Sequence, residues 1–306
     1  MKGQVAYATL DVQKRTLRFF ENFIGGSVLL SKIKPRHAEA FIAHRLSTVP
    51  SVSTANKDIR SLRSIFKLAI ELRGYLIEGQ NPFAKIKERK TTENEIRYVE
   101  VKEYLALMDK AKNLWWRGFL SIAYGSGLRR NEILHLTWKD IDFENQLIKV
   151  AAKKGTDNIL EWELKSRKNR VVPVSDESTQ LLANIQAQAP EGHPYVFISP
   201  ERLILIRHRR RIGKWNPTSE TVNNLIRDFN VIRCRARIDK CTPHDLRRSA
   251  ITNWAKELPI QIVQQLAGHS DISTTRKYYL AVRSEDMISA SKVKVLNDIL
   301  AKTKDD

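Results

Sequence analysis

Five side chains in three short motifs have the chemistry to act together on a phosphodiester. They are two arginines, two histidines and a tyrosine: Arg129, Arg247, His244, His269 and Tyr278. A phosphodiester resists attack because it is anionic and its alkoxide leaving group is poor. Catalysis therefore needs positive donors on the non-bridging oxygens, a nucleophile in line and an acid at the departing oxygen. The motifs hold cations where a metal-dependent enzyme would hold clustered carboxylates, which predicts chemistry with no metal ion and no other cofactor.

The two arginines are the natural clamp for the phosphate. Arg129 ends the run Gly-Ser-Gly-Leu-Arg, and Arg247 follows His244 by three residues, so that the latter two share a helix face. Guanidinium groups bind phosphate oxygens in bidentate fashion and stay charged. Glu132, three residues after Arg129, either holds that arginine in place or forms an ordinary ion pair on a helix surface, and the spacing allows both.

Tyr278 is the predicted nucleophile, with His244 and His269 as donors to the phosphate or as proton carriers. A phenol with a pKa of about 10 is a weak nucleophile at neutral pH, so neighbouring cations must help it to ionise. Attack would leave a phosphotyrosine and a free 5′-hydroxyl, and the stored bond would let the strand rejoin without ATP. Tyr279 is adjacent, and the residues alone leave it as a rival.

A lysine in a turn between two predicted strands could protonate the leaving 5′ oxygen. Lys165 lies in such a turn, shortly before the strand-like run that begins at Arg170. Lys153, Lys154 and Lys168 are almost equally suitable on the residues alone. A solvated turn lysine is the ordinary alternative for each of them.

The elements that must position these residues fall into two groups. In the first, apolar residues recur at helical spacing, which predicts a small all-helical bundle with helices over 4–24, 35–47 and 54–74. A charged, aperiodic stretch at 85–95 follows and is the candidate linker. We therefore expect these domain limits: a helical domain over 1–88, a linker over 89–96 and a second domain over 97–306.

The second domain is predicted to be mainly helical with one small antiparallel sheet, an α+β fold. Strand-like alternation of β-branched residues occurs in three short runs with basic turns between them, at 140–143, 146–151 and 170–174. Helices are expected before the sheet, from about residue 98, over 114–124 and over 132–138, and after it from 175 to the end. A very basic segment at 201–216, which includes Arg207–Arg211, is predicted to interrupt these later helices as an insertion.

The charge of the chain predicts a polyanionic partner. The formal net charge is +19 and the pI is near 9.9. Both predicted domains carry an excess of lysine and arginine, which is typical of nucleic-acid-binding proteins; a basic protein with no such partner is the alternative. The candidate DNA contacts lie on the polar face of the third helix and near the Lys165 turn: Lys57, Arg60, Arg63, Lys67, Lys168 and Arg170.

Other classes of protein are disfavoured by what the sequence lacks. The two cysteines, Cys234 and Cys241, are too few for a disulfide framework and are expected to be reduced. No run approaches the ~18 to 20 apolar residues needed to cross a bilayer, and the first residues show no apolar signal region. We expect a soluble protein in the cytoplasm with no membrane partner, associated with the nucleoid if the source is prokaryotic.

Together the motifs resemble those of the tyrosine recombinases, also called the phage integrase family, and the chain looks Xer-like. The matching runs are Gly127-Leu-Arg129-Arg-Asn-Glu132 for the family's first box, His244-Asp-Leu-Arg247 and Gly268-His269 for its second, and Thr275-Arg-Lys-Tyr278 for its nucleophile segment. The family places its tyrosine nine residues after the second histidine, which favours Tyr278 over Tyr279. The Lys165 turn is similar to its catalytic lysine turn, and residues 1–88 to its helical (SAM-like) core-binding domain.

The resemblance implies a site-specific DNA recombinase or integrase that needs neither metal nor ATP. Such enzymes cleave and rejoin strands through a covalent 3′-phosphotyrosine intermediate and a Holliday junction. They act as a homotetramer on two double-stranded DNA sites, and two domains close as a C-shaped clamp around each site. A C-terminal helix that docks on a neighbouring subunit is implied at about 285–302, where packing within the same chain is an equal alternative. Accessory DNA-bending or directionality proteins are further candidate partners.

Two other functions remain open on the sequence. A type IB-like topoisomerase shares the catalytic residues but relaxes supercoils, and the helical first domain favours recombination over it. A catalytically silent DNA-binding protein would have a broken residue set, whereas every position here is filled. The chain departs from the family in two places: the turn at 256–259 is about one residue short, and Arg207–Arg211 has no family role. No arm-type DNA-binding domain is expected ahead of the bundle.

Overall fold

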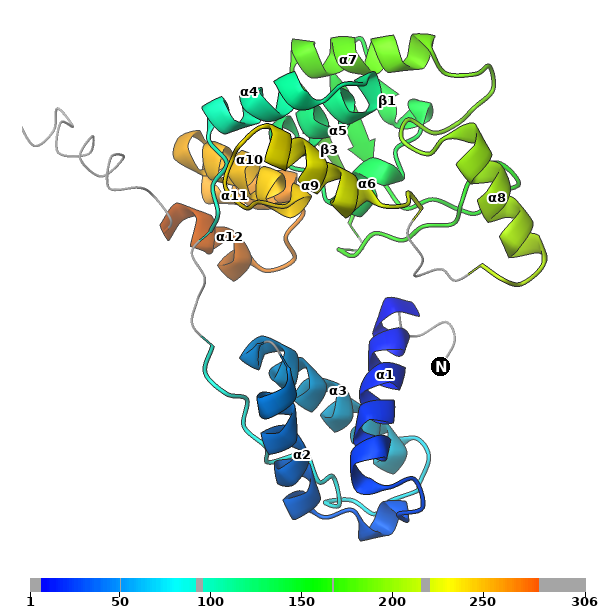
Figure 1. Ribbon diagram of the computed structural model, residues 1–306, viewed down its shortest axis with the longest axis vertical. Coiled ribbons are helices and arrows are strands. Elements are labelled where there is room, and N and C mark those ends of the chain that lie inside the picture. The colour runs from blue at the N-terminus through cyan, green and yellow to red at the C-terminus, as the bar shows by residue number, and fades with distance from the viewer. Residues whose placement is uncertain (1–6, 50, 92–95, 167, 216–220, 281–306) are drawn as a thin grey trace, which may run out of the picture. The chain divides into compact units, whose positions relative to one another are not determined.

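Residues 7–49, 51–91, 96–166, 168–215 and 221–280 are described by a computed structural model (Figure 1). The chain divides into two compact units, and the division falls between residues 94 and 95. The predicted docking helix at about 285–302 and part of the predicted linker lie outside the described residues. Within the described part of the chain, no helix is both long and apolar enough to cross a membrane.

The first unit is a bundle of three helices with a short 3-10 turn, η1 (Leu30–Lys32). The helices are α1 (Tyr7–Ile24), α2 (Pro35–Thr48) and α3 (Val52–Glu71). Pro35 occupies the first turn of α2, where a missing N–H costs nothing, and the Ser51 hydroxyl caps α3 by accepting from the Thr54 N–H at 3.3 Å. The three helices predicted from the sequence are confirmed.

The bundle is held together by an aromatic core and one buried ion pair. The ring of Phe20 makes edge-on contacts with Phe41, Phe66 and Phe83 at centroid distances of 5.1, 6.1 and 5.2 Å. Buried Asp58 on α3 accepts from Thr16 on α1 at 2.9 Å and from Arg45 on α2 at 2.8 Å. One carboxylate therefore ties all three helices together.

The second unit is mainly helical and includes a three-stranded sheet (Figure 1). Its helices before the sheet are α4 (Val101–Lys110), α5 (Leu114–Gly125), α6 (Arg130–Leu134) and the 3-10 turn η2 (Trp138–Asp140). Its strands are β1 (Ile141–Asp142), β2 (Leu147–Val150) and β3 (Arg170–Pro173). Its later helices are α7 (Asp176–Ala187), α8 (Pro200–Arg211), α9 (Leu225–Arg235), α10 (Pro243–Glu257), α11 (Ile260–Ala267) and α12 (Ile272–Leu280). The predicted α+β class is confirmed.

The sheet is antiparallel in the order β1-β2-β3, as predicted. Ile148 on β2 pairs with Val172 on β3, and both side chains are fully buried. Side chains alternate between faces along a strand, so Arg170, two residues before Val172, points to the same buried face. Val171 between them is half exposed.

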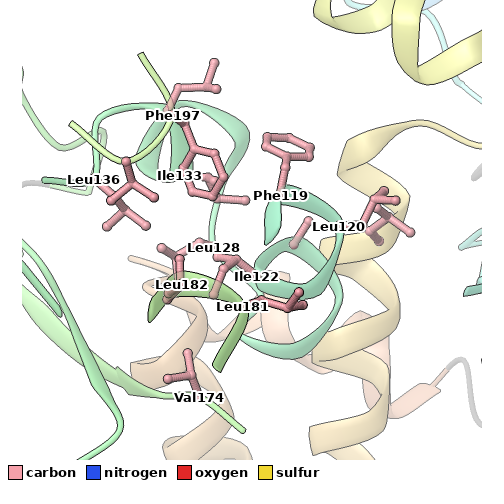
Figure 2. Close-up of a cluster of buried hydrophobic side chains, with 14 of the residues drawn as sticks. Phe119, Leu120, Ile122, Leu128, Ile133, Leu136, Val174, Leu181, Leu182 and Phe197 are labelled. Atoms are coloured by element: carbon pink, nitrogen blue, oxygen red, sulfur yellow. The ribbon is translucent and has the colours of Figure 1, made fainter. Parts of the chain in front are cut away.

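Helix α5 lies at the centre of this unit and packs against α7 and α10. Figure 2 shows its side chains Phe119, Leu120 and Ile122 among residues of the surrounding elements. The approach to α7 is close because small residues line it: Ser121 and Ser178 share a buried hydrogen bond of 2.7 Å. This core is the rigid support on which the candidate site is built.

The helix predicted over 132–138 is shorter than expected. α6 ends at Leu134, and the chain then runs extended beside residues 194–196: Val196 donates to the Leu136 carbonyl and Trp138 to that of Pro194, both at 3.0 Å. Thr137 and Asp140 then begin the turn η2, since both the N–H and the hydroxyl of Thr137 donate to the Asp140 carboxylate. Tertiary pairing has therefore overridden the local helical pattern.

The basic segment at 201–216 was wrongly predicted to interrupt the helices, since α8 is itself a helix. The Ser199 hydroxyl caps it by accepting from the Arg202 N–H at 3.3 Å. Leu203 and Ile206 share one helix face and are buried in a small separate core with Leu160, Tyr195 and Ile198. The exposed residues His208–Arg211 end the helix, where positive charge is favourable to the helix dipole.

Candidate active site

The three motifs meet in the second unit because α10, α11 and α12 pack against one another (Figure 1). His244 and Arg247 lie in the first two turns of α10, and Arg129 lies immediately before α6. His269 follows the glycine that ends α11, and Tyr278 lies in α12. Hydrogen bonds or ring contacts connect each of these except His244 to another member or to its supporting backbone.

Arg247 is the most deeply buried of the set, with 2% of its surface exposed. Its Nη1 donates to the Gly127 carbonyl, and its Nη2 donates to the Ala267 carbonyl at 2.6 Å and to His269 Nε2 at 3.3 Å. Burial, with the nearby charge of Arg129, lowers the pKa of Arg247 to about 9. That value is still above neutral pH, so the guanidinium stays charged.

The close approach at Gly127 requires glycine. Its φ is +56°, and an added Cβ would lie 2.8 Å from the Trp254 ring of α10. A side chain here would push the loop away from α10 and move the carbonyl that Arg247 binds. The Gly-rich run before Arg129 therefore has a packing reason.

Arg129 is fixed by Glu132 and by backbone. Its own N–H donates to Glu132 Oε2 at 2.7 Å, its Nη1 to Oε1 at 2.9 Å, and its Nη2 to the Gly268 carbonyl at 2.9 Å. Glu132 is only 3% exposed, so the surface ion pair considered from the sequence is wrong. Burial alone would raise the pKa of Glu132, but the hydrogen bond and charge of Arg170 outweigh it and hold the pKa below its ordinary value.

His269 and Tyr278 lie face to face. Their rings stack with centroids 5.9 Å apart and planes inclined by 19°. His269 Nδ1 lies 3.0 Å from the hydroxyl of fully buried Thr275, while its Nε2 faces the Arg247 guanidinium. Because arginine can only donate, Nε2 must accept there, which assigns the ring proton to Nδ1. Burial and the charge of Arg247 lower the pKa of His269 to about 4, so the ring is neutral at physiological pH.

The two adjacent tyrosines have different surroundings. Tyr278 is 8% exposed, and burial raises the pKa of its phenol against the opposing charges of Arg247 and Arg248. The Tyr279 hydroxyl donates at 2.5 Å to the Leu258 carbonyl, at the end of α10. Tyr279 is therefore anchored to backbone, whereas Tyr278 faces the histidine and the arginines.

His244 and Lys165 are the two candidates that the structure does not join to the rest. His244 is exposed at the start of α10, and partial desolvation with the charges of Arg248 and Arg247 lowers its pKa. Lys165 is exposed at the turn before β3. Among the described residues, we find no hydrogen bond or ion pair of the Lys165 side chain.

Some of the predicted DNA contacts are exposed, and others already bind groups within the protein. Lys57, Arg60, Lys67 and Lys168 are exposed, although Arg60 pairs with Glu88 at 2.5 Å and Lys67 with Glu71 at 3.6 Å. Arg63 is half-buried and donates to the carbonyls of Phe83 and Ile86, at 3.1 and 2.5 Å. Its position favours holding the segment after α3 rather than binding a phosphate.

Arg170 is the clearest departure from the expected DNA contacts. Its side chain is 3% exposed and its two terminal nitrogens donate to Glu132, at 3.1 and 2.5 Å. Its Nε donates to the Leu266 carbonyl at 2.9 Å. The expectation of a surface contact is corrected because the strand alternation turns this residue inward.

The similarity of the chain to known proteins identifies its family. The model of the phage integrase family matches residues 97–285. The chain belongs to this family, the tyrosine-type site-specific DNA recombinases. Tyrosine recombinase XerA of Thermococcus onnurineus is 31% identical over 248 residues, which cover 81% of this chain and 77% of that one.

Two solved structures share the fold. One is the Tn1549 transposon integrase in complex with transposon right end DNA, with a TM-score of 0.68, 20% identity and 95% of each chain covered. The other is a lambda integrase tetramer bound to a Holliday junction, with a TM-score of 0.66, 17% identity, and 90% of this chain and 72% of that one covered. The recombinase described here thus has the architecture of enzymes solved with DNA.

Two supporting residues of this recombinase were not found from its sequence. Thr275 holds the His269 ring, and Asp245 caps α10 by accepting from the N–H and the hydroxyl of Thr242, both at 2.8 Å. The capping could have been found, since Thr242 and Asp245 have the spacing of a helix start. Thr275 gave no signal beyond its place in the nucleophile segment.

Proposed function

We propose that this recombinase cuts DNA by attack of the Tyr278 hydroxyl on a phosphodiester whose non-bridging oxygens are held by Arg129 and Arg247. The contact between Tyr278 and His269 carries the proposal, because the same histidine meets the Arg247 guanidinium at 3.3 Å. Tyr278 of α12 and Arg247 of α10, the proposed nucleophile and phosphate-binding cation, thus both contact the His269 ring. Such preorganised donors stabilise the charge that develops on a phosphoryl group.

In the proposed step the Tyr278 oxygen forms a bond to phosphorus and the bond from phosphorus to the 5′ oxygen breaks. The raised pKa of Tyr278 means that its phenol is protonated in the DNA-free protein. His244, neutral because its pKa is lowered, accepts that proton, and Lys165 supplies one to the leaving oxygen. The product is a 3′-phosphotyrosine and a free 5′-hydroxyl. Attack by a 5′-hydroxyl from a partner strand reverses the step, so no ATP is consumed.

The substrate in this proposal is a pair of double-stranded DNA sites joined through a Holliday junction. A homotetramer provides one nucleophile for each strand, and both units bind the DNA as a clamp, with the helical bundle as the domain over 1–88. Exposed Lys57 on α3 and Lys168 near the Lys165 turn support contacts to phosphates. The chain's excess of positive charge supports the same partner. Accessory DNA-bending or directionality proteins would act on this assembly.

The test uses a nicked DNA substrate cut from the genomic flank of the gene, on which cleavage releases a short strand and traps the adduct. Wild type, Tyr278→Phe and Tyr279→Phe are compared for a denaturant-resistant protein–DNA adduct. We expect the adduct in wild type and Tyr279→Phe and its complete loss in Tyr278→Phe, with DNA binding retained in all three. An adduct that survives in Tyr278→Phe would sink the assignment of the nucleophile.

A further inference from the structure

Three successive backbone carbonyls at the end of α11 are each bound by a different arginine. Arg170 Nε donates to the Leu266 carbonyl at 2.9 Å, and Arg247 Nη2 to that of Ala267 at 2.6 Å. Arg129 Nη2 donates to the Gly268 carbonyl at 2.9 Å. We call residues 266–268 the carbonyl hub. It fixes three guanidinium groups that come from β3, α10 and the residue before α6.

The end of a helix is suited to this task. The last carbonyls of a helix have no partner within it, and the helix dipole makes that end negative, so that cations bind there favourably. Gly268 ends α11 in the left-handed conformation with a φ of +63°. A Cβ at this position would lie 3.0 Å from Arg170 Nη1. The glycine therefore lets Arg170 pass close to the backbone.

Arg170 differs from the other two arginines because it also holds the carboxylate that orients one of them. Its Nη1 and Nη2 donate to the two oxygens of Glu132, and the same two oxygens accept from Arg129. Arg170 thus lies between the carbonyl hub and Glu132. Its burial, at 3% side-chain exposure, places it out of reach of bulk solvent.

We infer that Arg170 is a positioning residue for strand cleavage: it locks Glu132 and the carbonyl hub together, and so fixes the Arg129 guanidinium and the loop that carries His269. This inference rests on the proposed function. Arg170 need not touch the DNA. Its planar fork matters, since lysine keeps the charge but has a single donor nitrogen, whereas Arg170 uses three to reach the two Glu132 oxygens and the Leu266 carbonyl.

Removal of this lock should slow chemistry more than binding. A displacement of about 1 Å in a positioning group can cost on the order of 100-fold in rate. We therefore expect Arg170→Met to lower the single-turnover cleavage rate on the nicked substrate by that order, with the dissociation constant for the DNA unchanged. Arg170→Lys should recover part of the rate. Lys149→Met, which removes an exposed cation from the neighbouring strand β2, is the matched control and should cleave like wild type.

A double-mutant cycle with Glu132→Gln separates positioning from DNA contact. If Arg170 acts through Glu132, which also binds Arg129 directly, the double variant should lose clearly less than the product of the two single losses. A loss that appears in the dissociation constant with a flatter salt dependence would instead make Arg170 a phosphate contact and overturn the inference. Multiplicative losses in the cycle, or an unchanged cleavage rate in Arg170→Met, would overturn it as well.

Hydrogen exchange gives a readout that does not depend on activity. The N–H groups of Gly268 and His269 are bonded to the carbonyls of Gln265 and Gln264. Arg170→Met should speed exchange in the peptide over 264–270, whereas Lys149→Met should not. Unaltered exchange there would refute the lock. Absence of an adduct in wild type would refute the proposed function instead, so the two failures are distinguishable.

Discussion

The helical bundle and the second unit both bury charged side chains, but they balance the charges differently. In the bundle, buried Asp58 meets one guanidinium, that of Arg45, and one hydroxyl. In the second unit, Glu132 is faced by three guanidinium groups: Arg129 and Arg170 within hydrogen-bond distance and Arg247 at 3.9 Å. Among the described residues, the first cluster is neutral and the second carries an excess of positive charge.

The difference shows how a fold can hold a charge for chemistry rather than for stability. The surplus arginines are satisfied by carbonyl oxygens, which accept hydrogen bonds without cancelling the charge. Uncancelled charge away from water is unfavourable and attracts a counter-ion. A phosphodiester would supply the missing negative charge, whereas the bundle needs none.

Arg247→Ala should have the largest effect of all, and this effect is on the cleavage rate of the second unit. Loss of one preorganised donor typically costs ~3 kcal/mol of the cleavage barrier, so single-turnover cleavage on the nicked substrate should fall on the order of 100-fold or more. The free energy of unfolding should change less than the cleavage barrier, because the loss of the hydrogen bonds to the Gly127 and Ala267 carbonyls is offset in part by relief of the repulsion from Arg129 and Arg170. A normal cleavage rate would remove Arg247 from the phosphate clamp.

Arg45→Ala is the matched substitution in the bundle and should behave in the opposite way. It leaves Asp58 buried without its cation, and breaking such a pair costs on the order of 3 kcal/mol. Urea denaturation should show that loss, while the folded protein should still form the adduct with Tyr278. A bundle as stable as wild type would mean that the ion pair contributes nothing to its stability.

A small divalent anion should bind the second unit and not the bundle. Binding to the folded state alone stabilises by about 1.4 kcal/mol when the ligand is present at tenfold its dissociation constant. Sulfate should therefore raise the melting temperature of wild type more than that of Arg247→Ala, and the general stabilising effect of sulfate cancels in the difference. Equal rises in melting temperature in the two proteins would argue against an uncompensated positive charge at the site.

The pH dependence of stability should give the smallest effect. The pKa of His269 is about 4 in the folded protein against an ordinary value of 6.5, so the unfolded chain takes up the proton first as pH falls. The contribution of neutral His269 to the free energy of unfolding is complete above pH 6.5 and is lost as the pH falls toward 4. Urea denaturation at pH 7 and pH 5 should show a smaller decrease for His269→Gln than for wild type. An equal decrease would contradict the lowered pKa.

The sequence could predict which residues the structure gathers in the second unit where they lie in short motifs. His244 and Arg247 share one helix, and Arg129 and His269 each lie close after a glycine at a turn. Tyr278 was favoured over Tyr279 by the spacing from His269 that the family resemblance implies. The bundle helices followed from the spacing of apolar residues such as Ile59, Leu62 and Phe66, which the structure buries. Local pattern is sufficient when the element and its function are both local.

The remainder depended on contacts between distant segments. Helix α6 ends early because residues 136–138 form backbone hydrogen bonds with 194–196. The sequence near Leu134 contains no pattern that predicts this pairing. The inward position of Arg170 could have been found, since it has the same parity as Val172 in β3. The carbonyl hub could not, because every residue has a carbonyl and only the folded chain shows which of them are bound by arginine.

The Arg170 guanidinium packs directly against the backbone of Gly268, so the residue types allowed at the two positions depend on each other. Any side chain at 268 would meet the guanidinium of residue 170 at about 3 Å and would also have to adopt a positive φ. A side chain at 268 is therefore disfavoured while Arg170 is present, whereas a smaller residue at 170 opens room at 268. In an alignment of close homologues, we expect these two columns to vary together, and glycine to be lost at 268 only where the arginine has already gone.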